Sequence, residues 1–254
     1  MPAPALPPDF ETWTFAGGAA AARRDVADAV RGALAAGRTL YQWAAAQPGR
    51  TAFTGRGDAY GVTLGGTRAV VRHARHGGFL APLLTDWFAG RPRFYREVAL
   101  SRRLAADGVR TPDVVAGVRY RALPGHRADV ATEQVAGADL VEVFFGERPP
   151  AGPPRVAALD ALGRLVRRLH DLGFVHPDLQ LRNLLLTGAA GATPQAWLLD
   201  VDTCRPMRGD RDRERARNLA RFYRSWAKWN RLRGPHLTEV DRALFSVGYL
   251  AEEP

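Results

Sequence analysis

Residues Val175–Leu186 read VHPDLQLRNLLL, and this stretch carries the strongest signal in the sequence. It sets a histidine, an aspartate and an asparagine in a short polar loop that runs straight into an apolar segment typical of a strand. After a short spacer, Leu198–Asp202 reads LLDVD, so two aspartates follow a second apolar run. We therefore expect two polar loops at the ends of short strands, with Asp178, Asn183 and Asp200 at the centre of one site.

These residue types suit phosphoryl transfer from ATP. That reaction needs a carboxylate to orient the acceptor hydroxyl and oxygen ligands to hold Mg²⁺. The spacing His-x-Asp-Leu-x-x-x-Asn, with a later aspartate after a strand, is typical of a kinase catalytic loop. We take Asp178, His176 and Asn183 as candidate catalytic residues, and Asn183 and Asp200 as candidate Mg²⁺ ligands. The alternative is a polar helix-cap loop followed by an unrelated turn. That alternative gives no reason for the His-x-Asp-Leu-x-x-x-Asn spacing, the flanking apolar runs and the later aspartate to occur together.

Elements upstream follow the order that a kinase requires. Gly55 and Gly57, in GRGDAYG, could cover the ATP phosphates with backbone N–H groups, although a plain turn explains the same glycines. The segment Ala69–Arg72 takes the place of the V-A-I-K strand, with arginine where lysine is expected. Because guanidinium can bind phosphate bidentately, Arg72 is the candidate for holding the α- and β-phosphates. Glu97, on the next helix, could pair with Arg72 or could be an exposed glutamate on a basic helix.

The order of elements predicts an α+β fold with two lobes of the protein-kinase-like type. We expect a partly helical N-terminal extension over residues 1–50, a small β-rich N-lobe over 51–134, and a short, mostly helical C-lobe over 135–254. Glu133 and Val135 would lie at the hinge, where backbone groups commonly meet adenine, and the ATP site would lie between the lobes. The expected helices are Arg23–Gln47, Arg93–Asp107, Val156–Leu172 and Arg211–Arg231, and the expected strands are Thr51–Phe53, Tyr60–Leu64, Ala69–Arg72, Val114–Tyr120, Val130–Val135, Asn183–Leu186 and Trp197–Leu199.

The composition excludes several classes of protein. A content of 46% hydrophobic and 24% charged residues is ordinary for a globular protein and argues against disorder. Cys204 is the only cysteine, so no intrachain disulfide can form and a reducing compartment is expected. The first residues lack the basic and apolar regions of a secretory signal, and no run approaches the ~20 apolar residues of a membrane span. We expect a cytoplasmic protein.

The formal charge of +10 suggests an anionic partner, which could be nucleic acid, a membrane surface or a substrate. Lys228 is the only lysine, so arginine is the default cation here and a given arginine is weak evidence for a ligand. Nucleic-acid binding would explain the charge but not the acidic loop, and we do not favour it.

The sequence resembles the 3-deoxy-D-manno-octulosonic acid (Kdo) kinases among the lipopolysaccharide core kinases, which themselves resemble protein kinases. The matching segments are Gly55–Gly57, Val71–His73, His76–Leu84, Phe94–Glu97, Ala131–Ala138, His176–Leu186 and Asp200–Arg205. The resemblance implies ATP-dependent phosphorylation of a Kdo hydroxyl on the lipid A inner core, at the cytoplasmic face of the inner membrane. It also adds Asp202 to the metal ligands, since the family has an acidic D-F-D-like end. Pro177, Val201 and the extension before Thr51 depart from the family pattern.

Two other functions stay open from the residues alone. The chain could be another small-molecule phosphotransferase, such as a relative of the aminoglycoside or sugar kinases, or a kinase-fold module that binds ATP without turnover. The short stretch after Asp202 leaves little room for a protein kinase's activation segment, so a protein acceptor is not expected. Two segments could meet lipid: the apolar run Gly77–Phe88, and the basic, aromatic helix Arg211–Arg231. Core packing is the favoured interpretation of both segments. The sequence does not indicate an oligomeric state.

Overall fold

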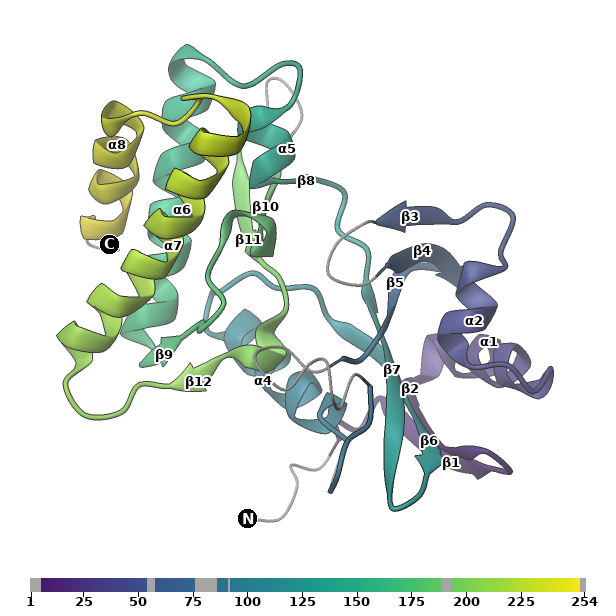
Figure 1. Ribbon diagram of the computed structural model, residues 1–254. Helices are drawn as coiled ribbons and strands as arrows, with labels where there is room; N and C mark the ends of the chain where they lie inside the picture. The colour runs from purple at the N-terminus through teal and green to yellow at the C-terminus, as the bar shows by residue number, and fades with distance from the viewer. Residues whose placement is uncertain (1–5, 54–57, 76–85, 91, 189–192, 252–254) are drawn as a thin grey trace. The chain divides into compact units, whose positions relative to one another are not determined.

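The computed structural model describes residues 6–53, 58–75, 86–90, 92–188 and 193–251 (Figure 1). The chain divides into two compact units. Unit 1 comprises Met1–Ser101 and Asp113–Gln134, and unit 2 comprises Arg102–Pro112 and Val135–Pro254. The mixed sheet-and-helix architecture confirms the expected α+β fold class.

Unit 1 is built on a seven-stranded sheet in which every neighbouring pair is antiparallel, with strand order β1-β2-β6-β7-β5-β4-β3. The β4–β5 hairpin turns at Gly65 and Gly66, both at positive φ, as the glycine pair predicts. The strands are β1 (Phe10–Phe15), β2 (Gly18–Arg23), β3 (Thr51–Phe53), β4 (Ala59–Leu64), β5 (Thr67–His73), β6 (Val114–Ala122) and β7 (Gly125–Glu133).

Strands β1 and β2 were not expected, because residues 1–50 were predicted to be a partly helical extension. β2 reads GAAAAR, and alanine favours helix over strand when judged by propensity alone. In the structure this strand pairs with β6, and a Cβ on Gly18 would lie 1.8 Å from the Arg119 carbonyl oxygen. The small side chains therefore suit a strand that lies close to its neighbour, and tertiary pairing overrides the local preference.

The single helix expected over Arg23–Gln47 is two helices, α1 (Arg24–Ala35) and α2 (Leu40–Ala45). Gly37 adopts a positive φ between them, and Thr39 starts α2 with a capping box. One apolar cluster holds α1 and α2 against the sheet, and a second cluster joins the sheet to α4 (Phe94–Ala106). The residues of the second cluster are Phe10, Ala21, Phe94, Val98, Val114 and Val130.

A buried aspartate anchors α2 to the sheet. Asp129 is fully buried and accepts hydrogen bonds from the Tyr41 backbone N–H and the Tyr120 hydroxyl, both at 2.8 Å. Its other oxygen lies 2.6 Å from His73 Nδ1, and this contact raises the pKa of His73 above its usual value. Burying a carboxylate is costly unless its lone pairs are satisfied, so this network fixes α2 in one place.

Unit 2 is mostly helical, with helices α5 (Leu140–Phe145), α6 (Gly152–Asp171), α7 (Arg211–Arg233) and α8 (Glu239–Leu250). α8 was not expected. It packs along α6, where a Cβ on Gly163 would lie 2.3 Å from the Phe245 carbonyl oxygen (Figure 1). Short strands form two small sheets, β11-β10-β8 and β12-β9, from β8 (Ala138–Asp139), β9 (Phe174–Val175), β10 (Leu184–Thr187), β11 (Gln195–Leu198) and β12 (Arg205–Pro206), with single 3₁₀ turns at η1 (Leu181–Asn183) and η2 (Val201–Thr203).

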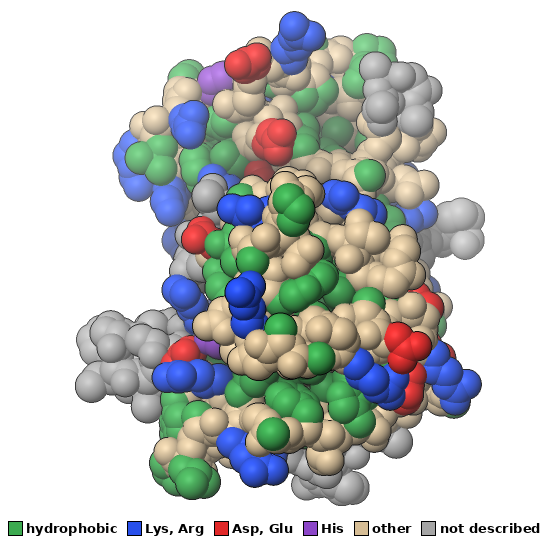
Figure 2. Space-filling view, turned by 90° about the vertical axis from the view of Figure 1, so that its right-hand side faces the viewer, with side chains coloured by type: hydrophobic (Ala, Val, Ile, Leu, Met, Phe, Trp, Pro, Cys, Tyr) green, Lys and Arg blue, Asp and Glu red, His purple; other side chains and the backbone are tan. Residues whose placement is uncertain are grey.

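The surface carries its positive charge in a dispersed form on the face that Figure 2 shows. Blue arginine and lysine side chains are spread over this face among apolar and acidic ones, and a few lie next to one another at its upper left edge. That face presents no single basic patch. Within the described ranges, no helix is both long enough and apolar enough to cross a membrane.

Candidate active site

The loop between β9 and η1 folds back on itself so that Asp178 and Asn183 meet. Asn183 Nδ2 donates to the Asp178 backbone carbonyl at 2.8 Å and lies 3.4 Å from carboxylate Oδ2. Gln180 Nε2 donates to the same Oδ2 atom at 3.0 Å. Arg221, on α7, contacts the other oxygen, with Nη2 at 2.5 Å from Oδ1. The carboxylate of Asp178 is therefore held at both oxygens while its side chain stays 23% exposed.

The second polar loop is tied directly to the first. Leu199 N donates to the Asn183 carbonyl at 2.9 Å, and Leu199 O lies 3.0 Å from His176 Nε2. These bonds continue the β10–β11 pairing, in which Leu184 faces Leu198. The next residue is Asp200, which is exposed, so the polar end of one loop lies beside the polar end of the other. The structure thus brings the candidate residues Asp178, Asn183 and Asp200 into one region of unit 2.

His176 has a supporting position rather than an exposed one. It was expected among the catalytic residues, but its side chain is completely buried. Burial lowers the pKa of this imidazole, so it is neutral near pH 7 and its Nε2–H can donate to the Leu199 carbonyl. Asn218 holds the backbone of the same residue, donating to its carbonyl at 2.6 Å and accepting from its N–H at 3.2 Å. These contacts favour a positioning role for His176 between the two loops, and its catalytic role stays a prediction.

Asp200 adopts a left-handed backbone conformation, with φ 59° and ψ 44°. It is the one non-glycine residue with positive φ in the part of the chain that the structure describes. Aspartate tolerates this region better than most residues, and strained conformations tend to gather at functional sites. The Thr203 hydroxyl donates to its carbonyl at 3.2 Å, which stabilises the turn into η2, where Asp202 lies.

The donor set fits a magnesium ion held jointly with phosphate oxygens. Because Asn183 Nδ2 donates a hydrogen bond to Asp178, the Oδ1 atom of Asn183 is the one suited to a cation. Within the described ranges no three His, Cys, Asp or Glu side chains cluster as a ready metal site. Mg²⁺ is usually bound through one or two carboxylates and completes its shell with substrate phosphates and water, so a set of two aspartates and one amide oxygen is appropriate.

In unit 1, the expected partner of Arg72 is present. The Arg72 guanidinium, on β5, forms an ion pair with the Glu97 carboxylate, on α4. Glu97 is 3% exposed, so the alternative of an exposed glutamate on a basic helix is wrong. A buried carboxylate needs a partner, and Arg72 supplies it while remaining 26% exposed at its own side chain.

The other nucleotide candidates are less complete. Glu133, the last residue of β7, pairs through its carboxylate with Arg23 Nη1 at 2.6 Å, and its N–H donates to the Asp113 carbonyl at 2.8 Å. The Glu133 backbone N–H, one of the groups expected to contact adenine, is therefore already hydrogen-bonded within the protein. Gly55 and Gly57 lie outside the described residues.

Sequence reasoning missed the contribution of α7. Asn218, Arg221 and Ser225 recur at helical spacing and contact the loop that carries Asp178, while Phe222 in the same stretch is buried. A polar residue at three of four positions on one helix face was the available signal, but the many other arginines of this helix concealed it.

The Arg72–Glu97 pair makes a testable prediction for unit 1. Arg72→Ala and Glu97→Ala should each lower the free energy of unfolding, since each removes one side of an ion pair whose carboxylate is buried. The double variant should lose about 1–3 kcal/mol less than the sum of the two, because the partners share one interaction. Denaturant unfolding measures this difference. The surface pair Arg164–Asp160 is the control, with an expected coupling of about 0.3–0.5 kcal/mol.

Arg72→Ala, together with Arg72→Lys, also tests nucleotide binding. Arg72→Lys should keep part of the ATP affinity, since lysine keeps the charge but not the planar fork. If the losses of unfolding free energy in the two single variants simply add up in the double variant, Arg72 and Glu97 do not share a stabilising interaction. If Arg72→Ala binds ATP as tightly as wild type, a residue other than Arg72 holds the ATP phosphates.

Unit 2 has a His-x-Asp-x-x-x-x-Asn loop bonded to Leu199, the residue before Asp200, and unit 1 has a partly buried Arg–Glu pair; together these features define a phosphotransferase of the protein-kinase-like class. The model of the lipopolysaccharide kinase (Kdo/WaaP) family matches residues 46–249, and the chain belongs to that family.

Individual relatives agree with this assignment. The chain is 33% identical over 200 residues to a 3-deoxy-D-manno-octulosonic acid kinase of Photobacterium profundum, covering 77% of this chain and 80% of that protein. It is 34% identical over 194 residues to the enzyme of the same name from Actinobacillus succinogenes, covering 74% and 78%. Among solved structures, WaaP in complex with acyl carrier protein matches with a TM-score of 0.53 at 23% identity, covering 84% of this chain and 83% of that one. This last likeness supports the fold.

Proposed function

We propose that this protein transfers the γ-phosphoryl group of ATP to a Kdo hydroxyl on the lipid A–Kdo inner core during lipopolysaccharide biosynthesis. Two observations support the proposal: membership of the lipopolysaccharide kinase family, and similarity to proteins named Kdo kinases over most of both chains. The observation that carries the chemistry is the Asp178–Asn183 contact, because Asn183 Nδ2 holds the Asp178 loop in place, at a solvent-accessible position, and leaves the Oδ1 atom of Asn183 for a cation.

The proposed roles follow from the atoms available. Asp178 would orient the acceptor hydroxyl and take its proton. Asn183 Oδ1, Asp200 and Asp202 would hold Mg²⁺, which supplies neutralisation of the phosphate charge when bound. Arg72, fixed by Glu97, would hold the α- and β-phosphates. In the same proposal Gly55 and Gly57 would cover the phosphates, and backbone groups at Glu133 and Val135 would contact adenine.

The direct test is transfer of labelled phosphate from ATP to purified Kdo₂–lipid A, with neutral and cationic soluble sugars assayed in parallel. Labelled glycolipid that depends on Mg²⁺ is the expected result. Transfer to the soluble sugars alone would favour a phosphotransferase of the aminoglycoside or sugar kinase type. Binding of ATP–Mg²⁺ without transfer to any acceptor would favour a non-catalytic module.

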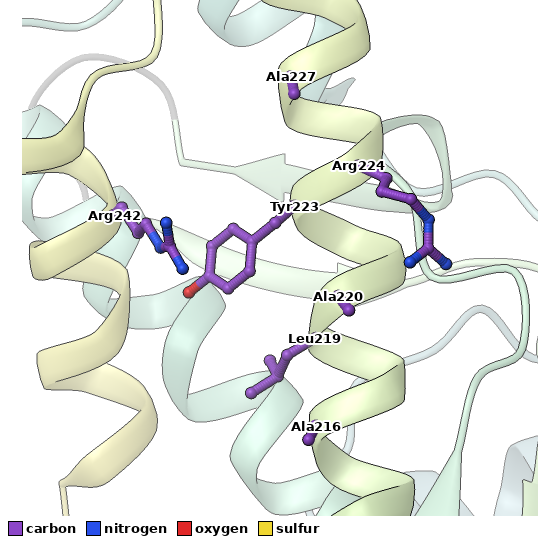
Figure 3. Close-up of a pocket in the computed structure, with 7 residues that line it drawn as sticks. All are labelled: Ala216, Leu219, Ala220, Tyr223, Arg224, Ala227 and Arg242. Atoms are coloured by element: carbon purple, nitrogen blue, oxygen red, sulfur yellow. The ribbon is translucent and has the colours of Figure 1, made fainter.

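The activity is proposed to take place at the cytoplasmic face of the inner membrane, on an anionic lipid surface. The C-terminal half of α7 supplies the charge: Arg224, Lys228, Arg231 and Arg233 are exposed, and no acidic residue lies between them. Beside them is a shallow, largely apolar groove between α7 and α8, in which Tyr223 points toward Arg242 while Arg224 projects to the other side (Figure 3). Cations flanking small apolar residues suit the boundary between headgroups and acyl chains.

Vesicle binding checks this surface. Replacing Arg224, Lys228 and Arg231 together by Gln should weaken binding to phosphatidylglycerol-rich vesicles by about 3 kcal/mol, since each cation near an anionic surface contributes about 1 kcal/mol. Co-sedimentation at low and high salt is the measurement. The control replaces the exposed Arg38, Arg121 and Arg148 by Gln, which removes the same charge elsewhere. Equal losses in the two triple variants would show that net charge, and not α7, attracts the protein.

A further inference from the structure

One face of α7 holds the loop that carries Asp178. Asn218 binds both backbone groups of His176, and Ser225 Oγ accepts from the Leu181 N–H at 3.2 Å. Phe222, between them, is completely buried. Arg221 is on the same face, but it contacts a side chain rather than the backbone, through Nη2 at 2.5 Å from Asp178 Oδ1. The loop is thus already fixed by its backbone contacts, and Arg221 adds a charge beside the carboxylate.

Arg221 is also more accessible than its neighbours on this face. Its side chain is 36% exposed, whereas Asn218 and Ser225 are buried residues. Within the described part of the chain its guanidinium makes one hydrogen bond, and its buried Nε has no hydrogen-bond partner. A guanidinium offers five N–H donors in a planar fork, so most of its donors are not used by Asp178.

A role limited to holding Asp178 does not explain this geometry. Gln180 and Asn183 already fix the other carboxylate oxygen, and a single end-on contact leaves most N–H donors of this 36% exposed side chain unused. An oxyanion that approached Asp178 would meet these donors. Two such groups come close in the proposed reaction: a carboxylate on the acceptor and the transferred phosphoryl group.

We propose that Arg221 is a specificity-determining residue that binds the carboxylate of an acidic-sugar acceptor while its hydroxyl is presented to Asp178. The inference rests on the proposed function. A positive group beside the base offsets the repulsion between the Asp178 carboxylate and the acceptor's own negative charge. A neutral sugar would gain nothing from this contact and would leave the arginine's remaining donors without a partner, so the site would favour the acid.

The experiment crosses one substitution with one change in the acceptor. Wild type, Arg221→Gln and Arg221→Lys are assayed with Kdo₂–lipid A and with the same glycolipid after reduction of its carboxylates to alcohols. Arg217→Gln is the matched control, one helical turn earlier, with a 62% exposed side chain and only a 3.9 Å contact to Glu214. Acceptor KM, ATP KM, kcat and thermal unfolding are measured for each protein.

The expected result is a specific loss with the acidic acceptor. Arg221→Gln should raise its KM about 10- to 100-fold, as expected for a charge-assisted hydrogen bond, with ATP KM unchanged. The KM of wild type should rise by a similar factor when the reduced acceptor replaces the acidic one. This comparison uses wild type alone, so it does not depend on the folding of a variant. The variant should then barely distinguish the two acceptors, with Arg221→Lys intermediate.

Other outcomes overturn the inference. A wild type that uses both acceptors equally has no carboxylate site. A fall in kcat of the same size for both acceptors would place Arg221 on the phosphoryl group or on Asp178 alone. A wild type that phosphorylates neither glycolipid would instead contradict the proposed function.

Discussion

Asp178→Asn is expected to lower kcat for phosphoryl transfer by about 10²- to 10⁴-fold, the usual contribution of a positioned general base. The amide keeps the size and shape of the side chain but cannot take the proton of the acceptor hydroxyl. The local structure should survive, because the Asn183 contact to the Asp178 backbone carbonyl at 2.8 Å does not involve the carboxylate. The Gln180 amide can turn over to accept from the new NH₂ group.

Steady-state kinetics, ATP titration and thermal unfolding together check this result. Asp160→Asn, which removes a carboxylate from a surface pair on α6, is the control and should leave kcat unchanged. ATP affinity should be close to wild type in both variants. Wild-type turnover in a folded Asp178→Asn protein would remove Asp178 from the mechanism.

The site in unit 2 was predictable because its residues are close in sequence and because strands fix their register. Residues 175–186 contain Asp178 and Asn183, and the alternation into β10 indicates where the loop ends. Pairing of Leu184 with Leu198 then places Asp200 beside the loop, which a strand-plus-aspartate pattern anticipates. Glu97 was open to two interpretations, since a helix pattern does not show whether one glutamate is buried.

Other parts of the structure depend on contacts that no local pattern encodes. β2 is a strand because it pairs with β6, about a hundred residues later, although its alanines favour helix. α8 has a helical pattern, yet its place depends on two glycines, Gly163 and Gly248, that let it approach α6 closely. Arg221 resembles every other arginine of α7 until the fold sets it against Asp178.

The left-handed conformation of Asp200 was equally invisible in the sequence, and it shapes the test of the metal site. Asp200→Asn removes the charge while keeping a residue type that tolerates positive φ. Changes to groups that only support metal ligands commonly cost 10- to 100-fold in affinity, so exchange of a charged oxygen ligand for a neutral amide oxygen should raise the Kd of ATP–Mg²⁺ by at least about 10-fold. Affinity for ATP without Mg²⁺ should change little, because the ligand acts only through the ion.

Asp200→Ala separates charge from backbone strain. Alanine pays roughly 1–2 kcal/mol for the left-handed conformation, so this variant should unfold more easily than Asp200→Asn. Both should lose Mg²⁺-dependent ATP binding if the carboxylate is the ligand, and Asp200→Ala should lose at least as much as Asp200→Asn because it keeps no side-chain oxygen. Titrations of ATP with and without Mg²⁺, beside denaturant unfolding, distinguish the two effects. If Asp200→Asn binds ATP–Mg²⁺ as tightly as wild type while Asp200→Ala does not, then Asp200 serves the turn into η2 and the ion is held by other oxygens.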